Sequence, residues 1–198
     1  LFTASASADA EDWPMFRGNV QRTGTAAVEQ PKGDFTGEKL WTVKLPDAVQ
    51  SSPAFYNGMI ILGSNDGNVY AMDAASGEIV WKFHTENWVT SSPAVADGKV
   101  FVGSYDSRVY CLDAKTGQMV WRFTTHSSVA SSPAVSNGVV YFGSNDGFVY
   151  AVNIKTGWQK WKFKTDRAVQ GSPVVAGGTV YIGNDEGKMV AKGSTSGK

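Results

Sequence analysis

Short apolar runs, separated by polar turns rich in glycine, follow one another along most of the chain. In the first unit they cover residues 53–56, 59–62, 68–72 and 78–84. Runs of this length, with side chains alternating between two faces, are typical of antiparallel strands. The Asn-Gly pair at 57–58 is a hairpin signal, because both residue types tolerate a positive φ. The pattern therefore predicts a small four-stranded sheet.

This unit recurs every 40 residues without an insertion, and one tryptophan marks each copy at Trp41, Trp81, Trp121 and Trp161. A sheet of this size cannot bury its faces alone, so repeated sheets pack against one another. Four short strands per repeat describe a propeller blade. We predict an all-β chain over residues 39–198, a β-propeller of four-stranded antiparallel blades built from four 40-residue repeats.

The two ends of the repeat region complement each other. The last repeat reaches Lys198 before its fourth strand, whereas residues 37–41 match the start of that strand. We expect the N-terminal strand to close the last blade, which would hide the sheet edges. Three arrangements stay open: a closed four-bladed ring, a homodimer that forms one eight-bladed ring, and a part of a longer chain.

The segment before the repeats has two parts. Residues 1–8 consist of small residues after Leu1 and Phe2, as at the end of a signal peptide, or else form a disordered start. We expect an exported protein, located in the periplasm, on the cell surface or outside the cell. Residues 9–38 form a leader, and we expect its Trp13 and Phe16 to pack on the propeller.

Composition excludes several classes of function. Lys plus Arg and Asp plus Glu number 18 each, without the clustered positive charge of a nucleic-acid-binding protein. No apolar run approaches the roughly 20 residues of a transmembrane helix. The single cysteine, Cys111, excludes a disulfide within the chain and a cysteine-based zinc site. It occupies a small, packed column of the repeat, and we expect it to be structural.

One recurring motif resembles a known family. Ala71, Asp73, Gly77 and Trp81 fit the pattern Ala-x-Asp-x-x-x-Gly-x-x-x-Trp, and later repeats fit it with a single change each. This is similar to the tryptophan-docking motif of quinoprotein-like (PQQ-like) propellers, including the barrel-assembly lipoprotein type. The resemblance implies rings of about seven or eight blades. It also implies that the four repeat tryptophans stack on neighbouring blades and lock the ring.

The resemblance also bears on cofactors. Quinoprotein dehydrogenases hold PQQ with a vicinal cysteine pair, a stacked tryptophan and a calcium site. No second cysteine exists here, so we expect no cofactor unless the chain is part of a larger quinoprotein with PQQ and calcium. The Asn65-Asp66-Gly67 turn lacks the ligand spacing of a calcium loop. We assign no metal ligand and no catalytic residue.

The loops before the innermost strands carry the clearest functional signal. They differ between repeats, whereas the flanking positions hardly change, and loops on a rigid scaffold commonly bind ligands. Trp88 stands in a column otherwise filled by alanine and serine. We expect Asp106 to lie in a turn on the opposite face. The candidate partner-binding residues at the channel mouth are Gln50, Asn87, Trp88, His126, Arg167 and Gln170.

These observations favour a non-catalytic, exported scaffold that binds a protein partner or a small ligand on its channel face. Two other interpretations stay open. The chain is a fragment of a PQQ-dependent dehydrogenase, or it is the sensor propeller of a larger receptor or kinase.

Overall fold

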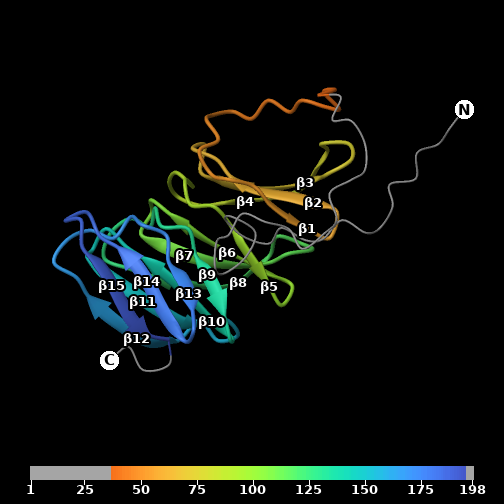
Figure 1. Ribbon diagram of the computed structural model, residues 1–198. Coiled ribbons are helices and arrows are strands. Elements are labelled where there is room, and N and C mark those ends of the chain that lie inside the picture. The colour runs from red at the N-terminus through yellow and green to blue at the C-terminus, as the bar shows by residue number, and fades with distance from the viewer. Residues whose placement is uncertain (1–36, 195–198) are drawn as a thin grey trace, which may run out of the picture.

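Fifteen strands in four sheets make up the part of the chain that the computed structural model describes, residues 37–194 (Figure 1). We name the sheets blades 1 to 4 in chain order. Blade 1 contains β1 (Ala54–Tyr56), β2 (Met59–Gly63), β3 (Asn68–Asp73) and β4 (Ile79–His84). Blade 2 contains β5 (Ala94–Ala96), β6 (Lys99–Ser104), β7 (Arg108–Asp113) and β8 (Met119–Thr124). Blade 3 contains β9 (Ala134–Ser136), β10 (Val139–Gly143), β11 (Phe148–Asn153) and β12 (Gln159–Lys164). Blade 4 contains β13 (Val174–Ala176), β14 (Thr179–Gly183) and β15 (Met189–Gly193).

Each blade is a simple antiparallel meander whose strands pair in chain order. The predicted strands and hairpins are confirmed: Asn57, Asp97 and Asn137 have positive φ values of 47°, 49° and 51° at the first turn of their blades. Turns alternate between the two ends of a meander. The first and third turns therefore lie at one end of the blade. The second turn and the crossover to the next blade lie at the other end.

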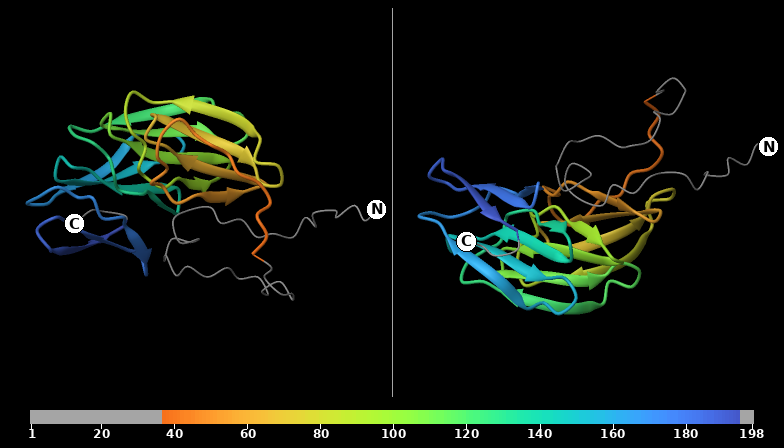
Figure 2. Two further views of the ribbon diagram at one scale, coloured as in Figure 1. Left: turned by 90° about the horizontal axis from the view of Figure 1, so that it is seen from above. Right: turned by 60° about the horizontal axis from the view of Figure 1, so that its bottom comes forward.

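The blades pack face to face, and apolar side chains fill the space between them. Ile61, Val69 and Ala71 of blade 1 meet Val100 and Val102 of blade 2 in one buried cluster. Two equivalent clusters join blade 2 to blade 3 and blade 3 to blade 4. The innermost strands β1, β5, β9 and β13 lie side by side in this order. The chain is thus an arc of stacked blades, as Figure 2 shows from two directions.

The expected closure of the last blade by the N-terminal strand is wrong for the described chain. Blade 4 has three strands, and no described segment pairs with the free edge of β15. Residues 37–44 lie against blade 1 instead, where the Trp41 indole Nε1 donates to the Ala74 carbonyl at 3.0 Å. The physical reason is the open arc, because three buried clusters join four blades and leave blades 1 and 4 apart. The expected signal-peptide remnant (1–8) and Trp13 and Phe16 of the leader lie outside the described residues.

Three blades share a buried tyrosine that is hydrogen-bonded to a partly buried aspartate. Hydroxyls of Tyr70 and Tyr110 donate to Asp66 and Asp106 at 2.6 Å, and Tyr150 donates to Asp146 at 2.7 Å. Burial, together with the hydrogen bond to the carboxylate, raises the pKa of Tyr70 and of Tyr110 to about 12. Burial opposes ionisation of Asp66, but hydrogen bonds from Tyr70 and from the Asn68 N–H outweigh it and lower the pKa of Asp66.

We expect the stability of the fold to decline as the pH rises above about 10. In the unfolded chain a tyrosine ionises near 10, whereas Tyr70 and Tyr110 ionise at about 12 in the folded state. A folded pKa above the unfolded one gives a contribution that is complete below the unfolded value and is lost as the pH rises through the folded value. Urea midpoints between about pH 8 and about pH 12 measure this decline, and Tyr110→Phe should flatten it. A constant midpoint over this range would contradict the expectation.

Candidate functional site

The loops that connect successive blades gather at one end of the arc, together with the second turn of each blade. We name this surface the loop face; it comprises residues 45–53, 85–93, 125–133 and 165–173 and the turns 64–67, 104–107, 144–147 and 184–187. Buried contacts fix the base of each loop. The Thr85 hydroxyl lies 2.9 Å from the Gly67 carbonyl oxygen and 2.6 Å from that of Asn87. The Val89 N–H donates to the Ser64 carbonyl at 3.1 Å.

A chain of serines holds the loops of neighbouring blades together. The Ser52 N–H donates to Ser92 Oγ at 2.8 Å, the Ser92 N–H to Ser132 Oγ at 2.9 Å, and the Ser132 N–H to Ser172 Oγ at 3.0 Å. Each bond joins residues 40 positions apart and therefore crosses from one blade to the next. These serines occupy the same position in each repeat of the sequence. Their hydrogen bonds make the loop face rigid.

Trp88 forms the most distinctive feature of this surface. Its side chain is 50% exposed, and its ring lies 5.9 Å from the Tyr105 ring at an interplanar angle of 52°. The Tyr105 N–H donates to the Trp88 carbonyl at 2.9 Å, which fixes the loop to the turn. The same backbone bond occurs in every blade, but the other pairs are Ala48 with Asn65, Ser128 with Asn145, and Ala168 with Asp185. Only blade 2 therefore presents an aromatic pair at this place.

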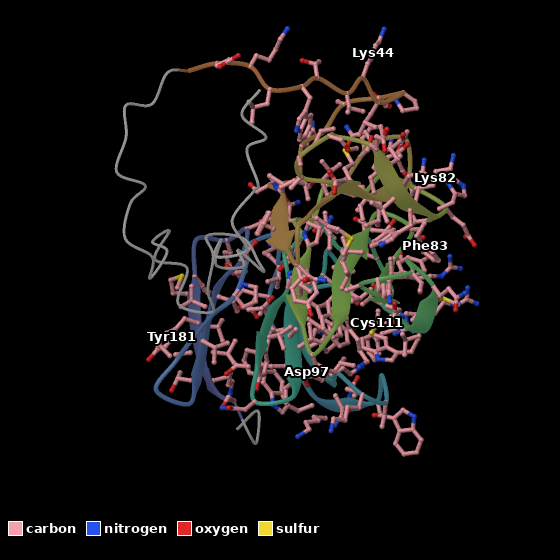
Figure 3. All side chains as sticks on the ribbon, turned by 90° about the vertical axis from the view of Figure 1, so that its right-hand side faces the viewer. Lys44, Lys82, Phe83, Asp97, Cys111 and Tyr181 are labelled. Atoms are coloured by element: carbon pink, nitrogen blue, oxygen red, sulfur yellow. The ribbon has the colours of Figure 1, made fainter. Side chains whose placement is uncertain are left out.

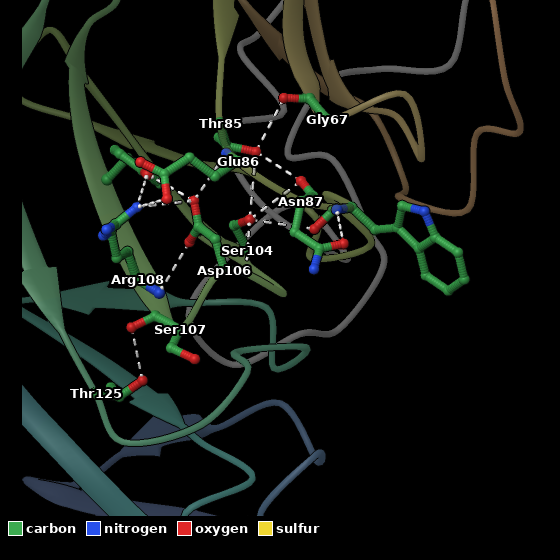
Figure 4. A network of polar contacts seen from close by, with 11 residues as sticks. Gly67, Thr85, Glu86, Asn87, Ser104, Asp106, Ser107, Arg108 and Thr125 are labelled. Atoms are coloured by element: carbon green, nitrogen blue, oxygen red, sulfur yellow. Dashed lines mark hydrogen bonds and ion pairs between the residues drawn. The ribbon is translucent and has the colours of Figure 1, made fainter.

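An ionic network joins the loop that carries Trp88 to the second turn of blade 2 (Figure 4). The Arg108 guanidinium lies 2.8 Å from Glu86 and 3.6 Å from Asp106, whose side chain is 3% exposed. Asp106 also accepts the Glu86 N–H at 3.0 Å. The hydrogen bond and the charge of Arg108 lower the pKa of Glu86, and the same hydrogen bond raises the pKa of Arg108. Glu86 and Arg108 are therefore held as an ion pair beside the loop that carries Trp88.

The other candidate residues lie on the same face but in the loops of different blades. Asn87 is exposed, and its side-chain oxygen accepts the Trp88 N–H at 2.8 Å. His126 is exposed, and its N–H donates to Asp146 at 3.0 Å. Arg167, Gln50 and Gln170 are exposed as well. The structure thus brings Asn87 and Trp88 together, while the remaining four are spread over blades 1, 3 and 4.

The expectation that Asp106 lies on the opposite face is wrong. Asp106 belongs to the second turn of blade 2, and this turn lies at the same end as the Trp88 loop, as the bonds from Glu86 and Tyr105 show. The opposite end, which we name the far end, carries the turns around Asn57-Gly58 and Asp73-Gly77 and their equivalents. Sequence reasoning also missed Tyr105, Glu86 and Arg108. Tyr105 could have been found, because its column otherwise holds asparagine and aspartate.

Two further possibilities, a reactive cysteine and a metal site, find no support among the described residues. Cys111 is fully buried between blades 2 and 3, and burial raises the pKa of its thiol to about 12. Within residues 37–194, no group of three or more His, Cys, Asp or Glu side chains is placed to hold a metal ion. The same residues contain no helix long and apolar enough to span a membrane.

The indoles of the repeat tryptophans contact the blade that follows. Trp81 Nε1 donates to the Ala114 carbonyl at 2.9 Å, and Trp121 Nε1 donates to that of Ile154 at 2.9 Å. Trp161 Nε1 donates to Ser194 at 3.2 Å. Glycine is required opposite the ring, since a β-carbon on Gly117 would lie 2.6 Å from the Trp81 ring.

Solved structures share this fold. BamB from Moraxella catarrhalis has a TM-score of 0.74 at 21% identity, over 82% of this chain and 54% of that chain. The quinohemoprotein alcohol dehydrogenase from Comamonas testosteroni has a TM-score of 0.77 at 19% identity, over 94% of this chain and 40% of that one. The designed protein Ika4 has a TM-score of 0.71 at 21% identity, over 79% of this chain and 98% of its own. The chain therefore spans about half or less of the two natural proteins.

The family assignment rests on the sequence. No curated protein sequence matches the chain. The family described as outer membrane protein assembly factor BamB does match it, over residues 32–88 and 65–198. These matches cover most of the chain and coincide with the repeated blades, so the chain belongs to this family of PQQ-like β-propellers.

Proposed function

We propose that this chain is a non-catalytic, exported scaffold that binds a segment of another protein on its loop face, with Trp88 as the anchor. The observation that carries the proposal is the half-exposed Trp88–Tyr105 pair on a rigid surface. Tryptophan, tyrosine and arginine dominate the energetics of protein interfaces. Trp88, Tyr105 and Arg108 lie together in one blade, and the equivalent pairs of the other blades are small or polar.

The local structure suits an anchor. The backbone bonds from Tyr105 and the Asn87 side chain hold the Trp88 main chain before any partner arrives. A preorganised aromatic side chain loses little conformational freedom on binding, so more of its contact energy appears as affinity. The Glu86–Arg108 ion pair belongs to the same loop and turn of blade 2, and its charged groups can supply directional contacts to a polar partner.

The family description supports a role in assembly. It names an outer membrane protein assembly factor, and such a factor works by contacting other proteins. We extend this role to the present chain, including an exported location, as part of the proposal. The chain spans 54% of the BamB structure, so the partner site proposed here concerns the four blades alone.

A quinone-dependent role fits the residues poorly. The resemblance to quinoprotein dehydrogenases requires a vicinal cysteine pair beside the cofactor, and the sequence holds one cysteine. That residue, Cys111, is buried in the interface between two blades and faces no open site. We therefore derive no chemical step through PQQ or calcium.

Removal of the Trp88 ring should weaken partner binding about 30-fold. Hot-spot truncations cost about 2 kcal/mol or more, and each 1.4 kcal/mol corresponds to a factor of about ten in affinity. The measurement is a pull-down from a periplasmic or secreted extract with the parent chain and Trp88→Ala, followed by titration of the captured protein. Trp158→Ala is the matched control, since Trp158 is 78% exposed outside the loop face. Unchanged capture by Trp88→Ala, or loss only with Trp158→Ala, would contradict the proposal.

The same preparation tests the quinone alternative. The parent chain is incubated with PQQ and calcium and separated from free cofactor by gel filtration. We expect no quinone absorbance in the protein fraction. Stoichiometric absorbance there would overturn the non-catalytic assignment.

A further inference from the structure

Blade 4 exposes a face that is buried in every other blade. Its Tyr181 is 40% exposed, whereas the equivalent Ile61, Phe101 and Tyr141 are 0–1% exposed. Met189 is 72% exposed, whereas the equivalent Val69, Val109 and Val149 are also 0–1% exposed. Figure 3 shows Tyr181 at the outer side of blade 4, at the opposite end of the arc from Lys44. In blades 1 to 3 this face is buried against the following blade, but among the described residues no blade covers it in blade 4.

The loop that enters blade 1 exposes one residue of the complementary side of this interface. In the three later blades, Val89, Val129 and Val169 are fully buried, because each packs against a glycine of the preceding blade. Val49 is the equivalent residue before blade 1, and it is 46% exposed. Its glycine counterpart would be Gly183 of blade 4. A β-carbon on Gly183 would meet nothing closer than the Met189 sulfur at 3.4 Å.

Residues 39–44 already have the form of a fourth strand. Trp41 docks on blade 1 as Trp81 docks on blade 2, with a β-carbon on Gly77 falling 2.8 Å from its ring. Trp41 and Val43 are partly buried, whereas Thr42 and Lys44 are exposed, and this alternation matches that of β8. Leu40 is 82% exposed. In blades 1 to 3 the fourth strand pairs with the third strand of its own blade. Among the described residues, residues 39–44 pair with no such strand.

We propose that residues 39–44 form the fourth strand of blade 4 in a second copy of the chain, so that two copies close one eight-bladed ring. The second copy supplies every missing part at once. Its residues 39–44 pair with the free edge of β15, its Val49 covers Gly183, and its Ser52 hydroxyl continues the serine chain to the Ser172 N–H. The face of blade 1 that carries the partly buried Ile60 and Leu62 then packs on Tyr181 and Met189.

The geometry requires both junctions to be identical. Each copy offers a blade 1 end and a blade 4 end, so the contact is head-to-tail, and such contacts form closed rings or open filaments. The ring closes at two copies. Closure and partner binding use separate surfaces, because the loop face lies at one end of the blades whereas the junctions lie on their flat faces.

The mass in solution tests the closure. Size-exclusion chromatography with light scattering on the full chain should give twice the chain mass of 21.2 kDa, constant as the concentration rises. Tyr181→Arg should give a single-chain mass, because the junction would bury an unpaired charge. The matched control Met119→Arg changes a side chain that is 47% exposed on β8, outside the junction, and should stay dimeric. A single-chain mass for the parent, as intramolecular cover by residues 1–36 would give, overturns the proposal, and so does a mass that grows with concentration.

Disulfide trapping tests the pairing itself. Val69 pairs with Phe83 and Tyr70 with Lys82 in blade 1, so Met189 should pair with Val43 of the second copy, and Val190 with Thr42. Consecutive antiparallel pairs alternate between bonded and non-bonded types, so one pair of the two suits a disulfide. Mixing Val43→Cys protein with Met189→Cys protein, and likewise Thr42→Cys with Val190→Cys, should give a covalent heterodimer under mild oxidation. No covalent dimer from either mixture would overturn the strand pairing.

Discussion

Trp81→Ala should lower the free energy of unfolding by about 3–5 kcal/mol, the range for truncation of a buried tryptophan. The Trp81 side chain is 8% exposed, contacts Gly117 of blade 2 and donates its indole N–H to the Ala114 carbonyl. Truncation would leave a cavity between two blades and an unpaired carbonyl beside it. Urea denaturation followed by circular dichroism measures the loss.

Trp158→Ala provides the comparison within the same residue type. Trp158 is 78% exposed, and its replacement should change the free energy of unfolding by less than about 0.5 kcal/mol. Equal stabilities of the two variants would show that the repeat tryptophans do not hold adjacent blades together.

Gly143→Ala should also be strongly destabilising, by about 1–3 kcal/mol or more. A β-carbon at this position would lie 2.4 Å from a methyl group of Val169 and 2.5 Å from the Val169 carbonyl oxygen. Both atoms belong to the loop that enters blade 4, and the oxygen is part of the backbone. Blades 3 and 4 would therefore have to separate, which would disturb the buried cluster between them.

Gly183→Ala is the matched substitution in the last blade. There the nearest atom is the flexible Met189 side chain at 3.4 Å, so a single chain should accept the methyl group with little loss. The comparison is made in the Tyr181→Arg background, which we expect to keep the chains apart. If Gly143→Ala were as stable as Gly183→Ala, the close approach of loop and glycine would not determine the spacing of the blades.

The strands could be predicted from the sequence because each one depends on local signals. Apolar runs, Asn-Gly or Asp-Gly turns and the 40-residue offset are all visible in a single chain, and they predict the strand bounds of blade 1 to within one residue. The closure of the ring could not be predicted in this way. It depends on the angle between blades, and this angle follows from contacts such as Val89 on Gly63 that appear only in three dimensions.

The candidate site was predicted in part. Trp88 was found because it breaks the column of small residues in its loop. Its neighbour Tyr105 breaks its own column in the same way and was overlooked. The misplacement of Asp106 was avoidable, since counting turns along a four-stranded meander puts the second turn at the same end as the crossover loop. The Glu86–Arg108 ion pair joins side chains 22 positions apart and needed the folded structure.

A protein partner that binds the loop face should contact this chain at the aromatic pair. Site-specific photo-crosslinking measures this contact, with a photoreactive phenylalanine analogue at position 105 beside Trp88 and, in a matched protein, at position 116 at the far end. Irradiation in the native extract should give a discrete adduct from position 105, Trp88→Ala should abolish it, and position 116 should give none. An adduct from position 116 alone, or none from position 105, would show that no partner binds at the aromatic pair.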